Sequence, residues 1–333
     1  MTKRVAINGF GRIGRNVLRA LVEAPRDSFD IVAINDLAPA ETSALLLELD
    51  STHGRLKAAI SHGDDYIEIN GRRIDYISER SPADCRWGQR RIDLVMECTG
   101  IFTDADKAAS HIDAGAGRVL VSAPSKGADA TIVYGVNHDI LTTEMKIISN
   151  ASCTTNCLAP LASALQESCG IVQGFMTTVH AYTGDQNLID GDHRDPYRAR
   201  AAAINMVPST TGAARAVGLV LPSLAGKLDG VAIRVPTPNV SAVDLVFQPE
   251  TVMSADALNA ALVDAAARMA PVLATTDRPL VSSDFNHDPA SSIVHLDQTR
   301  VMPDGMTRVL SWYDNEWGFS NRMLDTAEAF LRV

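Results

Sequence analysis

A glycine-rich turn between a short apolar segment and a helical pattern is the feature that most limits the fold of this chain. Apolar residues 5–7 lead into Gly9-Phe10-Gly11-Arg12-Ile13-Gly14, and a helical pattern follows over residues 15–22. This order of strand, turn and helix begins a βαβ unit that binds a dinucleotide, because glycines allow a tight turn and close approach of a pyrophosphate to the helix N-terminus. We therefore predict that Gly9, Gly11 and Gly14 contact a dinucleotide cofactor.

The second apolar segment indicates which dinucleotide binds. Residues 31–35 are apolar up to Asn35, and Asp36 follows 22 positions after Gly14. A carboxylate at this point accepts hydrogen bonds from the adenosine ribose hydroxyls and repels a 2′-phosphate. The sequence therefore predicts NAD in preference to NADP.

Strand-like and helix-like segments alternate up to about residue 150. The apolar segment 94–98 runs into Thr99 and Gly100, and the segment 118–122 ends at Ser122. Ligands bind at the carboxyl ends of strands in open parallel sheets, so Thr99 and Ser122 are predicted cofactor contacts. We expect an α/β fold that begins with a Rossmann-type dinucleotide-binding domain.

The pattern changes after residue 150, where extended segments outnumber helices. The extended segments are 230–235, 240–247, 281–284 and 308–313, and a helical pattern covers 255–269. Such grouping predicts an α+β domain. We therefore predict two domains, with NAD bound by the first, catalysis in the second, and a C-terminal helix packing back on the first; their bounds are 1–150, 151–315 and about 316–333.

The octet Asn150-Ala151-Ser152-Cys153-Thr154-Thr155-Asn156-Cys157 carries a candidate nucleophile. It joins an extended segment, 146–149, to a helical pattern over 158–165. A cysteine at a helix N-terminus is stabilised as the thiolate by unpaired N–H groups and by the helix dipole. We predict that Cys153 is the nucleophile and that the flanking Ser152 and Thr154 hydroxyls suit an anion.

A thiolate nucleophile needs a basic partner, and His180 is the best candidate. It ends an extended segment 27 residues after Cys153 and precedes a long polar stretch, 183–209. Cysteine attack on an aldehyde gives a thiohemiacetal, whose C–H can leave as hydride to NAD and leave a thioester. Arginines and hydroxyls near such a site would bind anionic groups, and the candidates are Arg200, Arg234, Thr183 and Thr211.

Composition excludes several classes of protein. The formal net charge of −10 argues against a nucleic-acid or anionic-membrane partner. We find no targeting segment or apolar run of membrane-span length, and the five cysteines lack disulfide-scaffold or metal-site spacing. We therefore expect a cytoplasmic protein without a bound metal.

These motifs together resemble the phosphorylating glyceraldehyde-3-phosphate dehydrogenases over nearly the whole chain. The matching segments are Asn8–Arg15, 34–36, 50–54, the Cys153 octet, 210–214, 234–240 and 311–318. The resemblance implies NAD-dependent oxidation of D-glyceraldehyde 3-phosphate to 1,3-bisphosphoglycerate. It also implies a homotetramer in which the 183–209 loop reaches a neighbouring subunit.

The resemblance implies a role for each of several residues. Cys153 is the expected nucleophile, His180 its base, and Thr183 and Arg234 the ligands of the substrate's own phosphate. The inorganic phosphate is expected at Ser152, Thr154, Arg200, Thr211 and Gly212. The expected NAD contacts are Arg12, Ile13, Asp36, Arg80, Ser122 and Asn315.

Three other functions remain open from the sequence. The sibling erythrose-4-phosphate dehydrogenases share much of the pattern. An acylating aldehyde dehydrogenase that uses coenzyme A would share the thioester chemistry, although the inorganic-phosphate residues argue against it. An NAD-binding redox sensor or interaction module would keep the glycine turn but should have lost a residue such as Cys153, His180 or Arg234, and none is lost.

Overall fold

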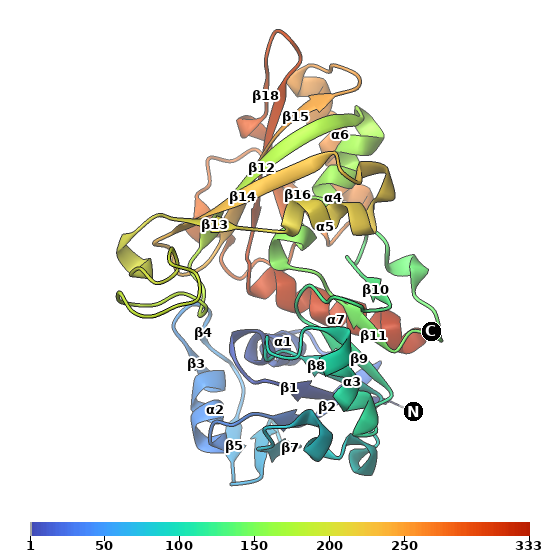
Figure 1. Ribbon diagram of the computed structural model, residues 1–333, viewed down its shortest axis with the longest axis vertical. Helices are drawn as coiled ribbons and strands as arrows, with labels where there is room; N and C mark the ends of the chain where they lie inside the picture. The colour runs from blue at the N-terminus through green and yellow to red at the C-terminus, as the bar shows by residue number, and fades with distance from the viewer. Residues whose placement is uncertain (1) are drawn as a thin grey trace. The chain divides into compact units, whose positions relative to one another are not determined.

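The computed structural model describes residues 2–333, which form two compact units (Figure 1). The first comprises the chain up to Ile132, His138–Ser152 and Ser320–Val333, and the second comprises Val133–Asn137 and Cys153–Phe319. Each unit has its own sheet.

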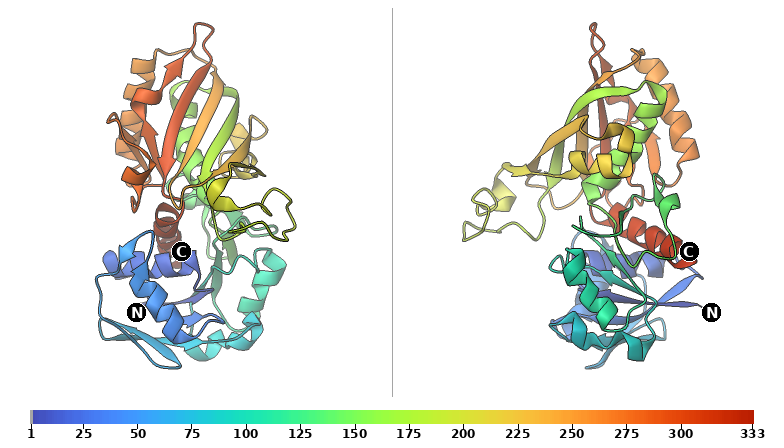
Figure 2. Two further views of the ribbon diagram at one scale, coloured as in Figure 1. Left: turned by 90° about the vertical axis from the view of Figure 1, so that its left-hand side faces the viewer. Right: turned by 45° about the vertical axis from the view of Figure 1, so that its right-hand side comes forward.

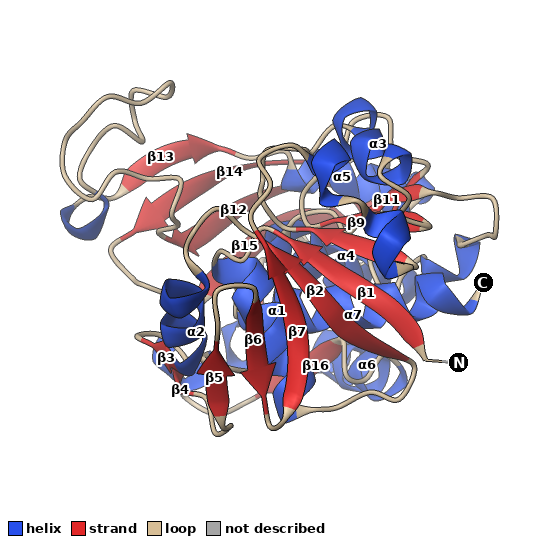
Figure 3. Cartoon of the chain, turned by 90° about the horizontal axis from the view of Figure 1, so that it is seen from below, coloured by secondary structure: helices blue, strands red, loops and turns tan. Residues whose placement is uncertain are grey.

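The first unit is built on a mixed sheet that is mostly parallel, with the order β10-β11-β9-β8-β1-β2-β7-β6-β5. Neighbours from β10 to β7 run parallel, and β5 and β6 add an antiparallel edge; Figure 3 shows β1, β2, β7, β6 and β5 side by side. The strands are β1 Lys3–Asn8, β2 Phe29–Asn35, β5 Ile60–His62, β6 Tyr66–Ile69, β7 Arg72–Ile77, β8 Leu94–Glu97, β9 Arg118–Val121, β10 Ala130–Thr131 and β11 Ile147–Ser149, with a separate pair β3 Leu49–Asp50 and β4 Gly54–Arg55.

Crossover helices connect the parallel strands of this sheet. Because both faces are covered, β1 and β8 are buried and lack polar alternation in their apolar runs. The helices are α1 Arg12–Glu23, α2 Ala40–Glu48 and α3 Ala105–Asp113.

The end of the chain also packs in the first unit. Helix α7, Trp317–Arg332, has its residues from Ser320 onward in this unit. The Arg26 guanidinium lies 2.5 Å from the Asp325 carboxylate and 2.9 Å from that of Glu328, and Arg118 donates to the Phe330 carbonyl. These contacts join segments about 200 to 300 positions apart in the sequence.

The second unit has a mixed sheet with the order β13-β14-β12-β15-β19-β17-β16, and β18 pairs with β19. Strand β12 runs parallel to β14 and antiparallel to β15. The strands are β12 Ile171–Ala181, β13 Val207–Thr210, β14 Leu228–Val235, β15 Ser241–Pro249, β16 Leu273–Thr276, β17 Ser292–His295, β18 Arg300–Val301 and β19 Thr307–Tyr313.

Three helices gather on one face of this sheet (Figure 2, right): α4 Cys153–Ser168, α5 Ala213–Val220 and α6 Ala255–Arg268. Helix α4 is buried along most of its length, with Leu158, Leu161 and Leu165 in the core. The segment between β12 and β13 extends away from the sheet (Figures 1 and 2). The other face leaves apolar side chains of β12 exposed, among them Phe175 at 50%.

Most predicted elements agree with the structure to within a few residues. The exception is the predicted extended segment 281–284, because Ser282–Phe285 form a 3₁₀ turn in which the Asp284 carboxylate accepts the Val281 N–H at 2.8 Å. The other 3₁₀ turns cover Pro82–Cys85, Trp87–Arg90, His138–Ile140, Ala202–Ile204, Pro222–Leu224 and Leu296–Gln298.

Candidate active site and cofactor pocket

The glycine turn of the first unit borders a pocket of about 410 Å³. The pocket lies at the carboxyl ends of β1, β2 and β8, where the topology of a parallel sheet places ligands. Its lining includes five of the predicted cofactor residues: Gly9, Gly11, Asp36, Arg80 and Thr99.

Each glycine of the turn has a distinct structural role. Gly9 has φ +91°, and an added Cβ would lie 2.6 Å from the Thr99 nitrogen. An added Cβ on Gly14 would lie 2.2 Å from the Gly9 carbonyl oxygen, whereas one on Gly11 would meet nothing within 4 Å. Two glycines therefore allow close packing, and Gly11 leaves the N-terminus of α1 open.

Asp36 is held in the pocket by backbone donors. Its carboxylate accepts the Phe10 N–H at 2.6 Å and the Ala38 N–H at 2.9 Å. No side chain caps α1 at Gly11, so the N–H groups of its first turn suit a pyrophosphate. The open start of α1 and the Asp36 carboxylate are the two features that the sequence analysis required of a dinucleotide site, and both border this pocket.

A buried hydrogen-bond network centred on Glu97 lies beside the pocket and holds the strand ends that line it. The Glu97 carboxylate accepts from Asn8 Nδ2 at 2.6 Å, from the Thr99 N–H at 2.7 Å and from the Thr99 hydroxyl, and lies 2.9 Å from His111 Nε2. The Trp87 indole donates to His111 Nδ1 at 3.0 Å, which leaves the ring proton on Nε2 facing Glu97. These bonds hold the strand ends that carry Asn8 and Thr99.

The remaining predicted cofactor residues lie outside this pocket lining. Arg12 pairs with Asp50 at 2.5 Å, and Ile13 and Gly14 form the first turn of α1. Ser122 follows β9 and its N–H donates to the Glu97 carbonyl. Asn315 belongs to the second unit, where its side-chain oxygen accepts the Ser241 hydroxyl at 2.8 Å.

In the second unit, the structure brings Cys153 and His180 together. Helix α4 begins at Cys153, and the thiol Sγ lies 3.5 Å from His180 Nε2 near the end of β12. Burial raises the pKa of the Cys153 thiol, and the Arg234 charge opposes that rise. Burial and the Arg234 charge lower the pKa of His180 to about 3, so its imidazole is neutral and can accept a proton.

Strand register places Arg234 beside the histidine. His180 on β12 is the direct partner of Arg234 on the parallel strand β14. Arg234 Nη1 lies 2.8 Å from His180 Nδ1 and 3.1 Å from the Ala181 carbonyl oxygen. The Arg234 guanidinium therefore lies next to the His180 imidazole, and burial lowers the pKa of Arg234.

Tyr313 is a residue of this centre that the sequence analysis did not identify. Its hydroxyl lies 2.9 Å from both the Thr154 and the Thr178 hydroxyls, and its ring meets the His180 ring edge-on at a centroid distance of 5.9 Å. Tyr313 thus fixes the position of the imidazole from the side of β19. A tyrosine in an alternating strand gave no signal of this role.

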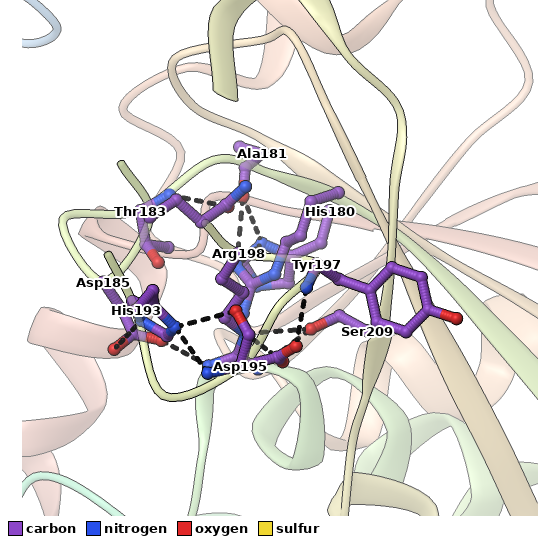
Figure 4. Close-up of polar contacts among 11 residues, drawn as sticks. His180, Ala181, Thr183, Asp185, His193, Asp195, Tyr197, Arg198 and Ser209 are labelled. Atoms are coloured by element: carbon purple, nitrogen blue, oxygen red, sulfur yellow. Dashed lines mark hydrogen bonds and ion pairs between the residues drawn. The ribbon is translucent and has the colours of Figure 1, made fainter. Parts of the chain in front are cut away.

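The structure does not bring Arg200 to this centre. Its side chain is 63% exposed and pairs with Asp190 at 2.9 Å. The nearby Arg198 is largely buried instead, with 17% of its side chain exposed. Its guanidinium donates to Ser209 Oγ at 2.9 and 3.0 Å and contacts the Asp185 carboxylate (Figure 4). Its charge helps to lower the pKa of His180.

Three other predicted anion ligands, Thr183, Thr211 and Gly212, border two turns of the second unit. The Thr183 N–H donates to Gln186 Oε1 at 3.4 Å, and the Thr211 hydroxyl accepts the Ala213 N–H at 3.1 Å. Gly212 precedes α5 without a side-chain cap, and an added Cβ would meet nothing within 4 Å. Ser152 directly precedes α4.

Two features are absent from residues 2–333. None of the helices is long and apolar enough to cross a membrane. No three His, Cys, Asp or Glu side chains in this range are grouped so that they could hold a metal ion.

Comparison with known proteins identifies the family. Residues 3–105 match the family model for the glyceraldehyde 3-phosphate dehydrogenase NAD binding domain, and residues 152–315 match that for the C-terminal domain. These matches confirm the predicted fold class and NAD as the cofactor.

Similar curated proteins cover the whole chain. Glyceraldehyde-3-phosphate dehydrogenases of Cereibacter sphaeroides and Xanthobacter flavus are 60% and 58% identical over 100% of both chains. That of Pseudomonas aeruginosa is 54% identical over 99% of this chain and 98% of its own. The chain belongs to the glyceraldehyde-3-phosphate dehydrogenase family.

Proposed function

We propose that this chain catalyses the NAD-dependent oxidative phosphorylation of D-glyceraldehyde 3-phosphate to 1,3-bisphosphoglycerate. The observation that carries the proposal is the pair of Cys153 Sγ and His180 Nε2, 3.5 Å apart at the N-terminus of α4, with Arg234 beside it. This arrangement combines a nucleophile, a base and an anion ligand.

The residues support a sequence of proton movements around a covalent intermediate. Cys153 loses its proton to His180, the thiolate sulfur bonds to the aldehyde carbon, and His180 returns the proton to the resulting alkoxide, which gives a neutral thiohemiacetal. Bound NAD supplies the hydride acceptor for the oxidation. His180 takes the hydroxyl proton as the C=O of the thioester forms, and inorganic phosphate then displaces the Cys153 thiolate to give the acyl phosphate.

The developing oxyanion lies within reach of fixed donors. The N-terminus of α4 presents backbone N–H groups next to the reacting sulfur, and these groups stabilise negative charge. His180 Nε2, once protonated, donates from the same side. These groups would stabilise the tetrahedral intermediate that forms before the thioester and the one that forms when phosphate attacks the thioester.

Two phosphate groups require two cationic sites. We assign the phosphate of the aldehyde to Arg234 and Thr183, and inorganic phosphate to Ser152, Thr154, Thr211 and Gly212. We assign to Arg198 the role in the second site that the sequence analysis expected of Arg200, because the Arg198 guanidinium is largely buried and that of Arg200 is exposed. NAD contacts are assigned to Gly9, Gly11, Arg12, Ile13, Gly14, Asp36, Arg80, Thr99, Ser122 and Asn315.

We also propose that the chain acts in the cytoplasm as a homotetramer with a NAD-binding domain, residues 1–150 and 316–333, and a catalytic domain, residues 151–315. Exposed apolar side chains on one sheet face and on the 183–209 loop support burial against further copies. They are Val172, Phe175, Val179, Leu188, Ile189, Ile204, Met206, Val231 and Val246, with exposed fractions of 38–80%. Sedimentation of Phe175→Glu tests this, and a tetramer that survives the charge unchanged would argue against that face.

One assay tests the catalytic proposal. NADH formation is measured with glyceraldehyde 3-phosphate or erythrose 4-phosphate, each with and without inorganic phosphate. We expect higher kcat/KM for glyceraldehyde 3-phosphate and dependence on phosphate. Preference for erythrose 4-phosphate would support the sibling activity, and no NADH from either aldehyde would support the redox-sensor or interaction alternative.

A further inference from the structure

The Ser241 hydroxyl lies between the end of strand β12 and the side chain of Asn315. Ser241 begins β15 and is 1% exposed. Its oxygen accepts the Ala181 N–H at 3.0 Å and lies 2.8 Å from Asn315 Oδ1. All three residues belong to the second unit and are buried. Ser241 has no part in the chemistry proposed above, but it contacts a residue that is assigned to the cofactor.

The backbone end of this pair of hydrogen bonds fixes the direction of both. A backbone N–H can only donate, so the Ser241 oxygen is the acceptor in its bond with Ala181. The Ser241 hydroxyl has one hydrogen to donate, and it makes no third hydrogen bond within residues 2–333 that could take it. This hydrogen therefore points to Asn315. Because an asparagine amide is oriented by its hydrogen-bond network, the atom of Asn315 that faces Ser241 is the oxygen.

Asn315 consequently directs the donor end of its amide away from Ser241. The two hydrogens on Asn315 Nδ2 make no hydrogen bond within residues 2–333 and remain available to a ligand. An NH₂ group pairs with an acceptor such as a carbonyl oxygen and not with another donor. An amide without a fixed partner at its oxygen could rotate and offer either end. The Ser241 hydroxyl therefore decides which chemical group of a ligand Asn315 can bind.

The backbone next to this amide is fixed as well. The buried Asp314 carboxylate accepts the N–H groups of Glu316 and Trp317 at 2.9 and 2.8 Å, at the start of α7. Its other oxygen accepts from Asn239 Nδ2 and from the His287 N–H, both at 2.7 Å. Both the position of the amide and its direction are therefore set before a ligand binds, which lowers the entropy cost of binding.

We propose that Ser241 is a positioning residue that makes Asn315 selective for a carbonyl oxygen on the pyridine ring of the cofactor; the proposal rests on the assignment of Asn315 to bound NAD made above. The pyridine ring of NAD carries a carboxamide, which has a carbonyl acceptor and an NH₂ donor. Asn315, held by Ser241, donates to the carbonyl and has no acceptor to offer the carboxamide NH₂. Ser241 acts on the cofactor only through the Asn315 amide.

The first test compares three cofactors on the unmodified full-length protein. Dissociation constants are measured by calorimetry for NAD, for 3-acetylpyridine adenine dinucleotide, which keeps the carbonyl but lacks the NH₂ group, and for 3-methylpyridine adenine dinucleotide, which lacks both. We expect NAD and the acetylpyridine analogue to bind equally well. The methylpyridine analogue should bind about 2- to 10-fold more weakly, which is the range of one neutral hydrogen bond. An acetylpyridine analogue that binds as weakly as the methylpyridine analogue would overturn the proposal.

The second test removes the hydroxyl with a pair of variants of the same shape. Ser241→Thr keeps a hydroxyl, and Ser241→Val has a methyl group in its place. Without the hydroxyl the Asn315 amide can present either end; NAD can pair with both ends, but the acetylpyridine analogue can pair only with the NH₂ end. Ser241→Val should therefore lose about 2- to 10-fold more affinity for the analogue than for NAD, whereas Ser241→Thr should not. A general loss of structure would weaken both cofactors equally, and equal losses or no loss in Ser241→Val would overturn the proposal.

Two sets of control variants show whether Ser241 acts through the amide. Ser311→Ala removes another buried hydroxyl of the same sheet, 2.8 Å from Ser292 Oγ, and should leave both dissociation constants unchanged. In the Asn315→Leu background, Ser241→Thr and Ser241→Val should bind each cofactor equally, because the amide is gone. A difference between these two that persists in that background would overturn the proposal.

Two further measurements separate this proposal from the proposed function. ADP-ribose lacks the pyridine ring, so its affinity should be the same in the unmodified protein and in every variant. NADH formation from glyceraldehyde 3-phosphate is measured on the same preparations. Normal oxidation without the expected pattern of cofactor affinities overturns the role of Ser241 alone, whereas absent oxidation in the unmodified protein overturns the proposed function. The first test needs no variant, so it decides the question even if Ser241→Val does not fold.

Discussion

Replacing Arg198 by alanine should specifically weaken the use of inorganic phosphate. The side chain is 17% exposed and its guanidinium lies against Ser209, so a phosphate contact there would be largely shielded from water. A charge-assisted hydrogen bond of this kind is worth about 1.5–3 kcal/mol, which corresponds to a fall of roughly 10- to 150-fold in kcat/KM for phosphate. Arg200→Ala is the matched control, because its exposed pair with Asp190 is screened by water.

The assay varies inorganic phosphate at saturating aldehyde and NAD, and records both the steady state and the first turnover. Arg198→Ala should keep the initial burst of NADH, because acylation of Cys153 precedes phosphate attack. Arg234→Ala should slow the burst instead, because it binds the aldehyde phosphate. A larger rise in phosphate KM for Arg200→Ala than for Arg198→Ala would refute the assignment, and loss of the burst in Arg198→Ala would place Arg198 in the aldehyde site.

Three further predictions follow from named contacts. Cys153→Ser should abolish NADH formation while NAD binding, measured by calorimetry, stays near normal; an active serine variant would remove Cys153 from the mechanism. Asp36 should favour NAD over NADP by about 1–3 kcal/mol, or roughly 5- to 150-fold in kcat/KM, and equal values for the two cofactors would contradict this. Burial alone would raise the pKa of Asp50, but hydrogen bonds from Arg12 and from backbone N–H groups lower it to about 2. Because this folded-state pKa lies below the unfolded one, Asp50 stabilises the fold above about pH 4 and loses that effect as pH falls toward 2. Measured by urea unfolding, the free energy of unfolding should therefore fall less on acidification in Asp50→Asn than in the unmodified protein, and an equal fall in both would contradict this.

Much of the first unit could be predicted because its signals are local. The glycine turn, the apolar strands and Asp36 lie in one stretch, and each acts on its sequence neighbours. The order of strands in the second unit could not be predicted in this way. Strand β12 lies between β14 and β15, and such pairings depend on contacts between distant segments.

The candidate site shows the same division between local and distant information. The start of α4 at Cys153 follows from the local change from an extended to a helical pattern, but the distance to His180 depends on tertiary packing. The long loop carries no periodicity, so the sequence could not show which of its arginines points inward. Hydrogen bonding to Ser209 on β13 selects Arg198, and no local pattern predicts that residues 207–210 form a strand.

The ion pairs of Arg26 have a consequence for how the protein is made. Its partners Asp325 and Glu328 lie 299 and 302 positions further along the chain, so the ribosome delivers them about 300 residues after Arg26. The surface of the first unit that packs against α7 therefore stays uncovered while the second unit is being translated. Such late closure leaves apolar surface of this unit uncovered during synthesis, and uncovered apolar surface is prone to aggregation.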